Sequence, residues 1–151
     1  MCQPPLLKFS TEIEYREYFR RTYVERGPIT TYDGIEVRFY NNQFDHAFYM
    51  SSIRGGGKTA FDRTRAERMD WIRWGLANDS LEVYRRVMHD GTVRRVILEP
   101  TGPYVIVCQL LPTAPMKAVF ITAYVVTDPD TVGLIRSNPR WCRGSQKKNR
   151  R

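Results

Sequence analysis

The sequence has no long apolar run and little cysteine. No stretch reaches the roughly 18 apolar residues of a membrane-spanning helix, and the first residues, MCQPPLLKF, lack the charged and apolar regions of a signal peptide. The three cysteines, Cys2, Cys108 and Cys142, are odd in number and widely spaced, which argues against a disulfide framework. We therefore expect a cytoplasmic protein in a reducing setting, without a membrane partner.

Histidine is scarce as well, and this excludes several chemistries. His46 and His89 are the only two, and together with the scattered cysteines they do not form a metal-ligand set. The sequence contains no Gly-x-Ser-x-Gly elbow and no Cys/His spacing typical of ester or peptide hydrolysis. We therefore predict no metal site and no cofactor.

The net charge of +8 is concentrated at the C-terminus. Residues 136–151 contain seven Lys or Arg and no acidic residue, which leaves the rest of the chain with a net charge of only +1. We predict a single domain over residues 1–135 and a basic tail over residues 136–151. Such a tail is typical of nucleic-acid binding and equally of a solvated chain end.

The patterns along the chain predict an α+β fold. A helix is expected from Thr11, where Thr11 and Glu14 form a capping box, to Arg26. The strands are predicted at Ile35–Tyr40, Phe44–Met50, Leu81–Met88, Val93–Leu98, Tyr104–Leu111 and Lys117–Val126. A second, arginine-rich helix follows Thr59, a short one follows Asp128, and Asp90-Gly91 indicates a hairpin turn. This order predicts a curved antiparallel sheet with the N-terminal and arginine-rich helices packed on it.

The arginine-rich helix raises the main question of function. At helical spacing Arg65 falls within the apolar arc formed by Phe61, Met69, Ile72 and Leu76, and Arg68 lies on its flank. An arginine is rarely buried without a partner. Arg65 therefore either forms an internal ion pair, for example with Glu82 or Glu99, or is directed at an anion.

The loop before this helix resembles a phosphate-binding loop only in part. Gly55-Gly56-Gly57-Lys58-Thr59 has the right ending, but Ser52 stands where the motif requires glycine, so an NTPase is not expected. Ser52, Arg54 and Lys58 remain candidate RNA-binding residues because free backbone amides beside a lysine favour an anion. A solvated loop is the alternative.

Three further residues are candidates for catalysis. His46, in the predicted strand with Phe44 and Phe48, is either a general acid or base or a hydrogen-bonded core histidine. Thr122 and Tyr124 share a predicted face with Phe120 and can contact a phosphate and a base, although both residue types are common in strands. His89, at the hairpin turn, is expected to be an exposed bystander.

The segments FDHAFY, FDRTRAERMDWI and FITAYVV, within residues 35–126, resemble phage-type members of the barnase–EndoU–colicin–RelE ribonuclease superfamily. The resemblance implies a small α+β nuclease-like domain that cleaves RNA without a metal and leaves a cyclic phosphate. It also implies that His46 is the acid or base, that Arg65 or Arg68 stabilises the phosphate, and that Thr122 and Tyr124 contact the substrate.

We therefore hypothesise a metal-independent endoribonuclease, a toxin or phage-linked effector acting on RNA such as tRNA, with an antitoxin or inhibitor protein as a further partner. The alternative is a non-catalytic nucleic-acid-binding or assembly module anchored by the basic tail. A third hypothesis is a structural or inhibitory phage protein whose partner binds Trp71 and Trp74.

Overall fold

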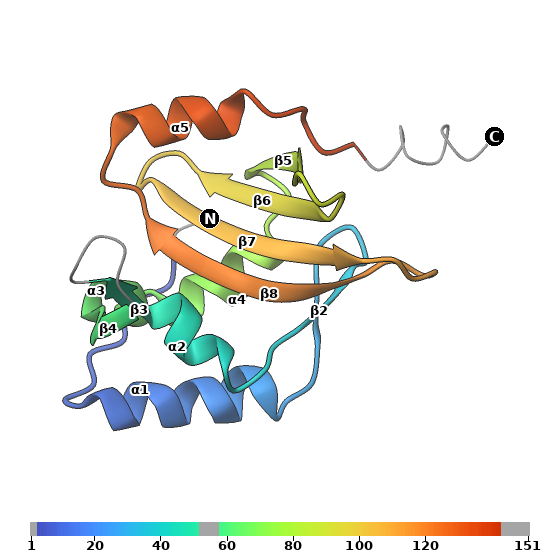
Figure 1. Cartoon of the computed structure of the whole chain (residues 1–151). Coiled ribbons are helices and arrows are strands. Elements are labelled where there is room, and N and C mark those ends of the chain that lie inside the picture. Colours follow the sequence, from blue (N-terminus) through green and yellow to red (C-terminus); the bar gives the residue numbers. More distant parts are fainter. Residues whose placement is uncertain (1–2, 52–57, 143–151) are drawn as a thin grey trace.

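A curved six-stranded sheet separates two helical layers in the computed structural model, which describes residues 3–51 and 58–142 (Figure 1). The helices are α1 (Glu12–Phe19), the π-helical turn η1 (Arg20–Val24), α2 (Gln43–Phe48), α3 (Arg63–Glu67), α4 (Met69–Ala77) and α5 (Pro129–Arg136). The strands are β1 (Ile29–Thr30), β2 (Glu36–Arg38), β3 (Tyr49–Ser51), β4 (Lys58–Phe61), β5 (Glu82–Val87), β6 (Val93–Glu99), β7 (Tyr104–Leu111) and β8 (Lys117–Val125). In these ranges no helix is long and apolar enough to cross a bilayer.

The main sheet has the order β1-β2-β8-β7-β6-β5 and is mixed. Strands β5 to β8 pair antiparallel through consecutive connections, as predicted. Strand β2 pairs parallel with β8, so the expectation of a purely antiparallel sheet is wrong at this position. Two segments far apart in the sequence meet there, and local patterns carry no information on such a pairing.

Each face of the sheet has its own apolar core. Helices α1 to α4 cover one face, where the larger core forms around aromatic side chains such as Phe19, Phe39 and Phe120. Helix α5 covers the other face, where Ile135 packs against a smaller cluster that includes Val96 and Val107. The fold is thus a single α+β domain of three layers, with a helical layer on each side of the sheet.

Helix α1 begins where the capping box predicts. The Thr11 hydroxyl accepts a hydrogen bond from the Glu14 backbone N–H, and the Glu14 carboxylate accepts one from the Thr11 backbone N–H. Tyr15, Phe19 and Tyr23 form the buried side of α1 and η1. Aromatic residues at a spacing of four thus attach this helix to the larger core.

The predicted strand Phe44–Met50 is wrong, because most of it forms helix α2. Phe44, Ala47 and Phe48 are buried, and their spacing of three and four residues is helical. His46 is exposed on this helix, so the interpretation as a core histidine is wrong as well. A short segment with phenylalanines four residues apart satisfies both periods, and tertiary packing selected the helix.

The arginine-rich helix begins later than predicted. Thr59 lies in β4, which pairs with β3, and Asp62 is the N-cap, accepting a hydrogen bond from the Arg65 backbone N–H. The helix breaks at Arg68, which separates α3 from α4. Met69, Ile72 and Leu76 of the predicted apolar arc are fully buried.

A β-bulge in β8 reverses the alternation of its side chains. Phe120 pairs with Cys108 and Thr122 pairs with Val107, so Ile121 is an extra residue on this strand. Phe120 therefore points to the larger core, whereas Thr122 and Tyr124 face the α5 side. The prediction that Phe120 shares a face with Thr122 and Tyr124 is wrong because strict alternation does not anticipate a bulge.

The one fully buried arginine among the described residues is Arg95 on β6. Its two terminal nitrogens each donate to an oxygen of Asp33 at 2.9 Å, and its guanidinium lies 5.0 Å from the Trp141 ring centroid. Burial alone raises the pKa of Asp33, but hydrogen bonds from Arg95 and Thr31 lower it below its ordinary value. The pair ties β6 to the β1–β2 turn and to the C-terminal segment.

The first residues of the predicted basic tail lie against β5. The Arg85 backbone N–H donates to the Pro139 carbonyl oxygen at 2.8 Å, and the Trp141 backbone N–H donates to the Val83 carbonyl oxygen at 2.8 Å. Arg136 also donates to the Glu82 carboxylate through Nε and Nη2, which lowers the pKa of Glu82 to about 2. Residues 136–142 therefore cover the edge of the sheet that β5 forms.

We expect Asp33→Asn to lower the free energy of unfolding by about 3 kcal/mol, since it leaves the buried Arg95 guanidinium without a countercharge. Urea denaturation measures this, with the exposed Asp79→Asn as control. Because the pKa of Asp33 is lowered on folding, its contribution is present above the ordinary aspartate pKa and is lost as the pH falls through the folded value. Equal stability of the two variants at neutral pH would contradict the assigned role.

Candidate anion-binding site

Two arginines lie directly opposite each other on the α5 side of the sheet. The register of the β5–β6 hairpin pairs Arg86 with Arg94, next to the pair of Arg85 and Arg95. Because side chains alternate along a strand and Arg95 points to the larger core, Arg94 points to the α5 side. Like charges directly opposite on a sheet are destabilising. In the described part of the chain neither Arg86 nor Arg94 has an ion-pair partner.

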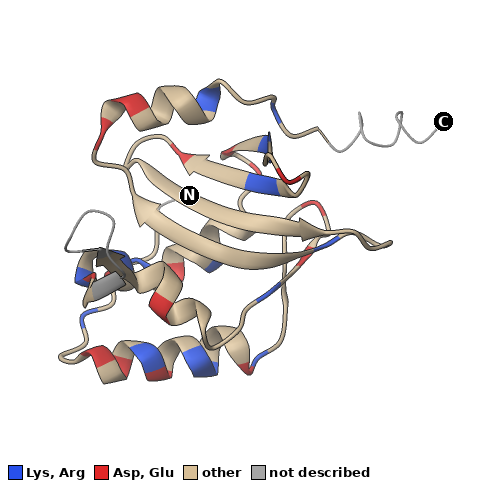
Figure 2. Cartoon of the chain, in the orientation of Figure 1, with Lys and Arg blue, Asp and Glu red and all other residues tan. Residues whose placement is uncertain are grey.

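These arginines line a pocket of about 430 Å³ between the sheet and α5. The other residues of its wall come from β6 to β8, from α5 and from the turn after α5: Val96, Val107, Thr122, Tyr124, Thr131, Leu134, Ile135, Ser137 and Asn138. Figure 2 shows basic residues on β6 and at the C-terminal end of α5. No carboxylate lines the pocket, so its charge is positive.

Two buried polar atoms in this wall have no hydrogen-bond partner in the described protein. They are Thr122 Oγ1 and Arg94 Nε. An unsatisfied buried donor costs about 1–3 kcal/mol, so such groups in folded proteins are usually satisfied by an ordered water or a ligand. A hydroxyl and a guanidinium N–H both donate to anionic oxygen, which makes an oxyanion the chemical complement of this wall.

Tyr124 connects this pocket with the arginine-rich helix. Its ring lines the pocket, and the Arg65 guanidinium lies 5.5 Å from the ring centroid. Burial raises the pKa of Tyr124, while the nearby Arg65 and Arg86 act to lower it. The pKa remains above its ordinary value, so the phenol is protonated at neutral pH and is a hydrogen-bond donor.

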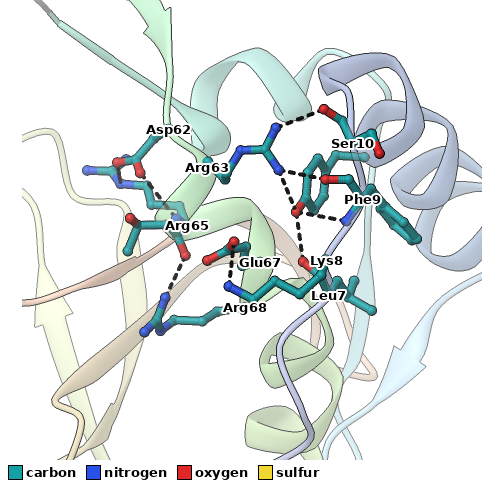
Figure 3. Close-up of polar contacts among 11 residues, drawn as sticks. Leu7, Lys8, Phe9, Ser10, Asp62, Arg63, Arg65, Glu67 and Arg68 are labelled. Carbon is teal, nitrogen blue, oxygen red and sulfur yellow. Dashed lines mark hydrogen bonds and ion pairs between the residues drawn. The ribbon is translucent and has the colours of Figure 1, made fainter.

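Arg65 itself is largely neutralised inside the protein (Figure 3). Its Nε lies 3.2 Å from Asp62 Oδ2, and its Nη1 donates to the Ala47 carbonyl oxygen at 3.2 Å. Its side chain is 23% exposed. The internal ion pair is therefore the correct alternative for Arg65, with Asp62 as the partner rather than Glu82 or Glu99.

The neighbouring arginines of α3 and its end also have internal partners. Arg68 donates to the Thr64 carbonyl oxygen at 2.9 Å and lies over the Trp71 ring at 5.2 Å, and Arg63 donates to the carbonyl oxygens of Phe9 and Ser10 (Figure 3). These contacts fasten the N-terminal segment to the helix. Arg68 does not line the pocket beneath α5.

The structure brings some of the predicted site residues together and leaves others apart. Thr122 and Tyr124 line one pocket, and Arg65 reaches it through the Tyr124 ring. His46 does not line this pocket, and His89 is exposed at the β5–β6 turn, as predicted. Of the candidate RNA-binding residues, Ser52 and Arg54 lie outside the described residues, and Lys58 is described only as the first residue of β4.

The sequence prediction missed Arg86 and Arg94, although a signal for them exists. With Asp90-Gly91 as the two central residues of the turn, counting outward along the hairpin places Arg86 opposite Arg95, which already indicates a like-charge pair between these strands. The predicted antiparallel pairing was correct, but the observed register is shifted by one residue and pairs Arg86 with Arg94. What the sequence does not reveal is that α5 packs on this face and forms a pocket with the two arginines, of which Arg86 is exposed and Arg94 is partly buried.

The chain matches no known protein-family model, no curated protein and no solved structure. Its own geometry is therefore the basis for assigning a function. Within residues 3–51 and 58–142, no group of three or more His, Cys, Asp or Glu side chains is arranged to hold a metal ion.

We expect Thr122→Val to leave the free energy of unfolding unchanged or to raise it by up to about 1 kcal/mol, because the substitution removes a buried hydroxyl that has no partner. The matched control is Thr11→Val, which removes a hydroxyl that caps α1 and should cost about 1 kcal/mol. Both are measured by urea denaturation. A loss for Thr122→Val as large as that of the control would show that the Thr122 hydroxyl stabilises the fold itself.

Proposed function

We propose that the protein binds RNA by its backbone phosphates in the pocket beneath α5. The observation that carries this proposal is the unpaired Arg86–Arg94 pair, held across one hairpin beside the unsatisfied Thr122 hydroxyl. Two like charges directly opposite each other on a sheet cost stability, and an anion bound between them would relieve that cost. Guanidinium groups match phosphate oxygens in geometry and in charge.

Single-stranded RNA suits this pocket better than a duplex. Tyr124 offers a ring in the wall next to the arginines, and bases of unpaired nucleotides stack on aromatic side chains in single-strand recognition. A pocket walled by a helix on one side admits a splayed nucleotide but not a paired one. Loops or ends of structured RNA such as tRNA, in the cytoplasm, are the substrates that fit this proposal.

The C-terminal residues add further positive charge to the chain. Ser137 and Asn138 line the pocket, and the sequence beyond Cys142 adds five Lys or Arg without an acidic residue. Such residues add salt-dependent affinity through counterion release and carry no sequence specificity. An antitoxin or inhibitor protein that covers the pocket would block RNA binding, so such a partner belongs to the same proposal.

A second candidate is the metal-independent endoribonuclease to which the sequence resemblance points. One observation favours it: the protonated Tyr124 phenol lies among arginines, with Arg65 over its ring. Cleavage through the ribose 2′-hydroxyl requires a base that takes the hydroxyl proton, an acid that protonates the leaving 5′-oxygen, and cations at the phosphate. Tyr124 and the arginines offer the acid and the cations, and solvent water takes the hydroxyl proton. In this candidate Tyr124 acts as the general acid, Arg86 and Arg94 stabilise the phosphate, and His46 has no direct part.

We expect the double substitution Arg86→Gln and Arg94→Gln to weaken binding of a fluorescent single-stranded RNA at least tenfold. It should also reduce the slope of log affinity against log salt by about 2, since each lost phosphate contact reduces this slope by about 1. The control is Arg21→Gln, which removes an exposed charge from η1, in the opposite helical layer. Equal slopes for the double variant and the control would contradict the proposed pocket.

The same RNA incubated in EDTA separates binding from cleavage. Cleavage that Tyr124→Phe abolishes and His46→Ala preserves supports the ribonuclease candidate at this pocket. RNA that stays intact at high protein concentration would show that the protein binds RNA without cleaving it. Cleavage that only His46→Ala abolishes would place the chemistry on α2 and contradict the role of Tyr124.

A further inference from the structure

The N-terminal segment lies along α3 and α4 as an extended peptide outside the sheet. The Trp71 indole Nε1 donates to the Pro4 carbonyl oxygen at 2.8 Å, and the Leu7 backbone N–H donates to the Glu67 carbonyl oxygen at 2.8 Å. The segment belongs to no described helix or strand before Thr11. The protein thus already holds a proline-containing peptide of its own through a tryptophan indole N–H.

Trp74 lies three residues further along the same helix and has the same indole N–H donor, but this donor is not used. Its indole Nε1 is buried and has no hydrogen-bond partner among the described residues. It lines a groove of about 450 Å³ between α4 and the α1–η1 helix, and Pro4 forms part of the wall. The groove therefore continues the track on which the N-terminal segment lies.

The groove offers aromatic walls and one free donor. Besides Trp74 it is lined by Tyr18, whose hydroxyl donates to Asp70 Oδ1 at 2.7 Å; burial, with help from Asp70, raises the pKa of Tyr18 to about 12. The phenol is therefore already satisfied, and its ring remains as wall. Proline-rich peptides in the polyproline II conformation have free carbonyl oxygens, and grooves lined by aromatic side chains are their usual binding sites.

The charges at the rim indicate which flanking residue fits. Arg73 donates to the Thr22 carbonyl oxygen at 3.0 Å and lies over the Tyr23 ring at 5.4 Å, so it is held by the protein. Arg26 is exposed and has no ion pair within the described residues, whereas Asp70 already accepts from Tyr18. Arg26 and Arg73 outnumber Asp70 in the wall of the groove, so its net charge is positive, which favours an acidic residue in the ligand.

We propose that this groove binds an extended, proline-containing segment of a partner protein that has an acidic residue beside its prolines. A peptide carbonyl oxygen accepts from Trp74 Nε1, as the Pro4 carbonyl oxygen does from Trp71, and the acidic side chain lies near Arg26. The groove is on the opposite side of the sheet from the α5 pocket, so this inference does not depend on RNA binding.

The test is a titration of the full chain with an acetylated and amidated peptide, Pro-Pro-Leu-Pro-Glu, followed by NMR of the indole N–H groups. The resonance that disappears in Trp74→Phe should shift on addition of the peptide. The affinity should fall at least tenfold in Trp74→Phe, which keeps a ring but removes the donor, and should not change in Tyr40→Phe, a control at an exposed position. Replacement of the prolines by alanine should abolish binding.

A second variant keeps the test decisive if Trp74→Phe does not fold. Arg26→Glu changes only an exposed side chain, and we expect it to weaken binding of the acidic peptide severalfold and to favour a peptide with lysine in place of glutamate. A Trp74 resonance that the peptide does not move, or equal binding of the alanine peptide, would overturn the proposal. A shift caused by a short RNA and not by the peptide would overturn it as well, in favour of a base-stacking site.

Discussion

The buried pair of Arg95 and Asp33 is the interaction on which the rest of the structure depends. It joins β6 to the β1–β2 turn, and through the Trp141 ring it fixes the chain that follows α5. Because Arg95 must point into the larger core to reach Asp33, the next residue on the strand, Arg94, must point to the other face. The hairpin register then sets Arg86 beside it. A structural ion pair thus determines where the unpaired cations lie.

Two sets of arginines in the described chain differ in their partners. Arg63, Arg65 and Arg68 of the N-terminal layer donate to carbonyl oxygens or pair with a carboxylate and so hold segments of the chain together. Arg86 and Arg94 have no ion-pair partner in the described chain and lie in a pocket without a carboxylate. An arginine that is already paired inside the protein contributes little to the free energy of binding an anion. An unpaired arginine in a pocket contributes more, because the bound anion supplies its missing countercharge.

The sequence correctly predicted those features of the fold that depend only on residues close together in the chain. The capping box at Thr11 and the Asp90-Gly91 hairpin are short-range features, and both are found where the sequence places them. The error at Phe44–Met50 arose where the apolar spacing fits both a strand and a helix, and the error at Thr59 arose because the pairing of β4 with β3 delays the start of the helix to Asp62. The bulge at Ile121 turned Thr122 away from Phe120. Thr122 and Tyr124 were correctly predicted to share a face, but the arginines beside them become visible only once α5 is placed over the sheet.

The central claim is that the pocket beneath α5 binds the phosphates of RNA, and the Nε–H resonance of Arg94 reports on it directly. In a protein labelled with ¹⁵N-arginine, titration with a short single-stranded RNA should shift this resonance first and slow the exchange of its proton with water, since the ligand satisfies a donor that the protein leaves unpaired. A resonance that stays in place while those of other arginines move would show that RNA binds elsewhere.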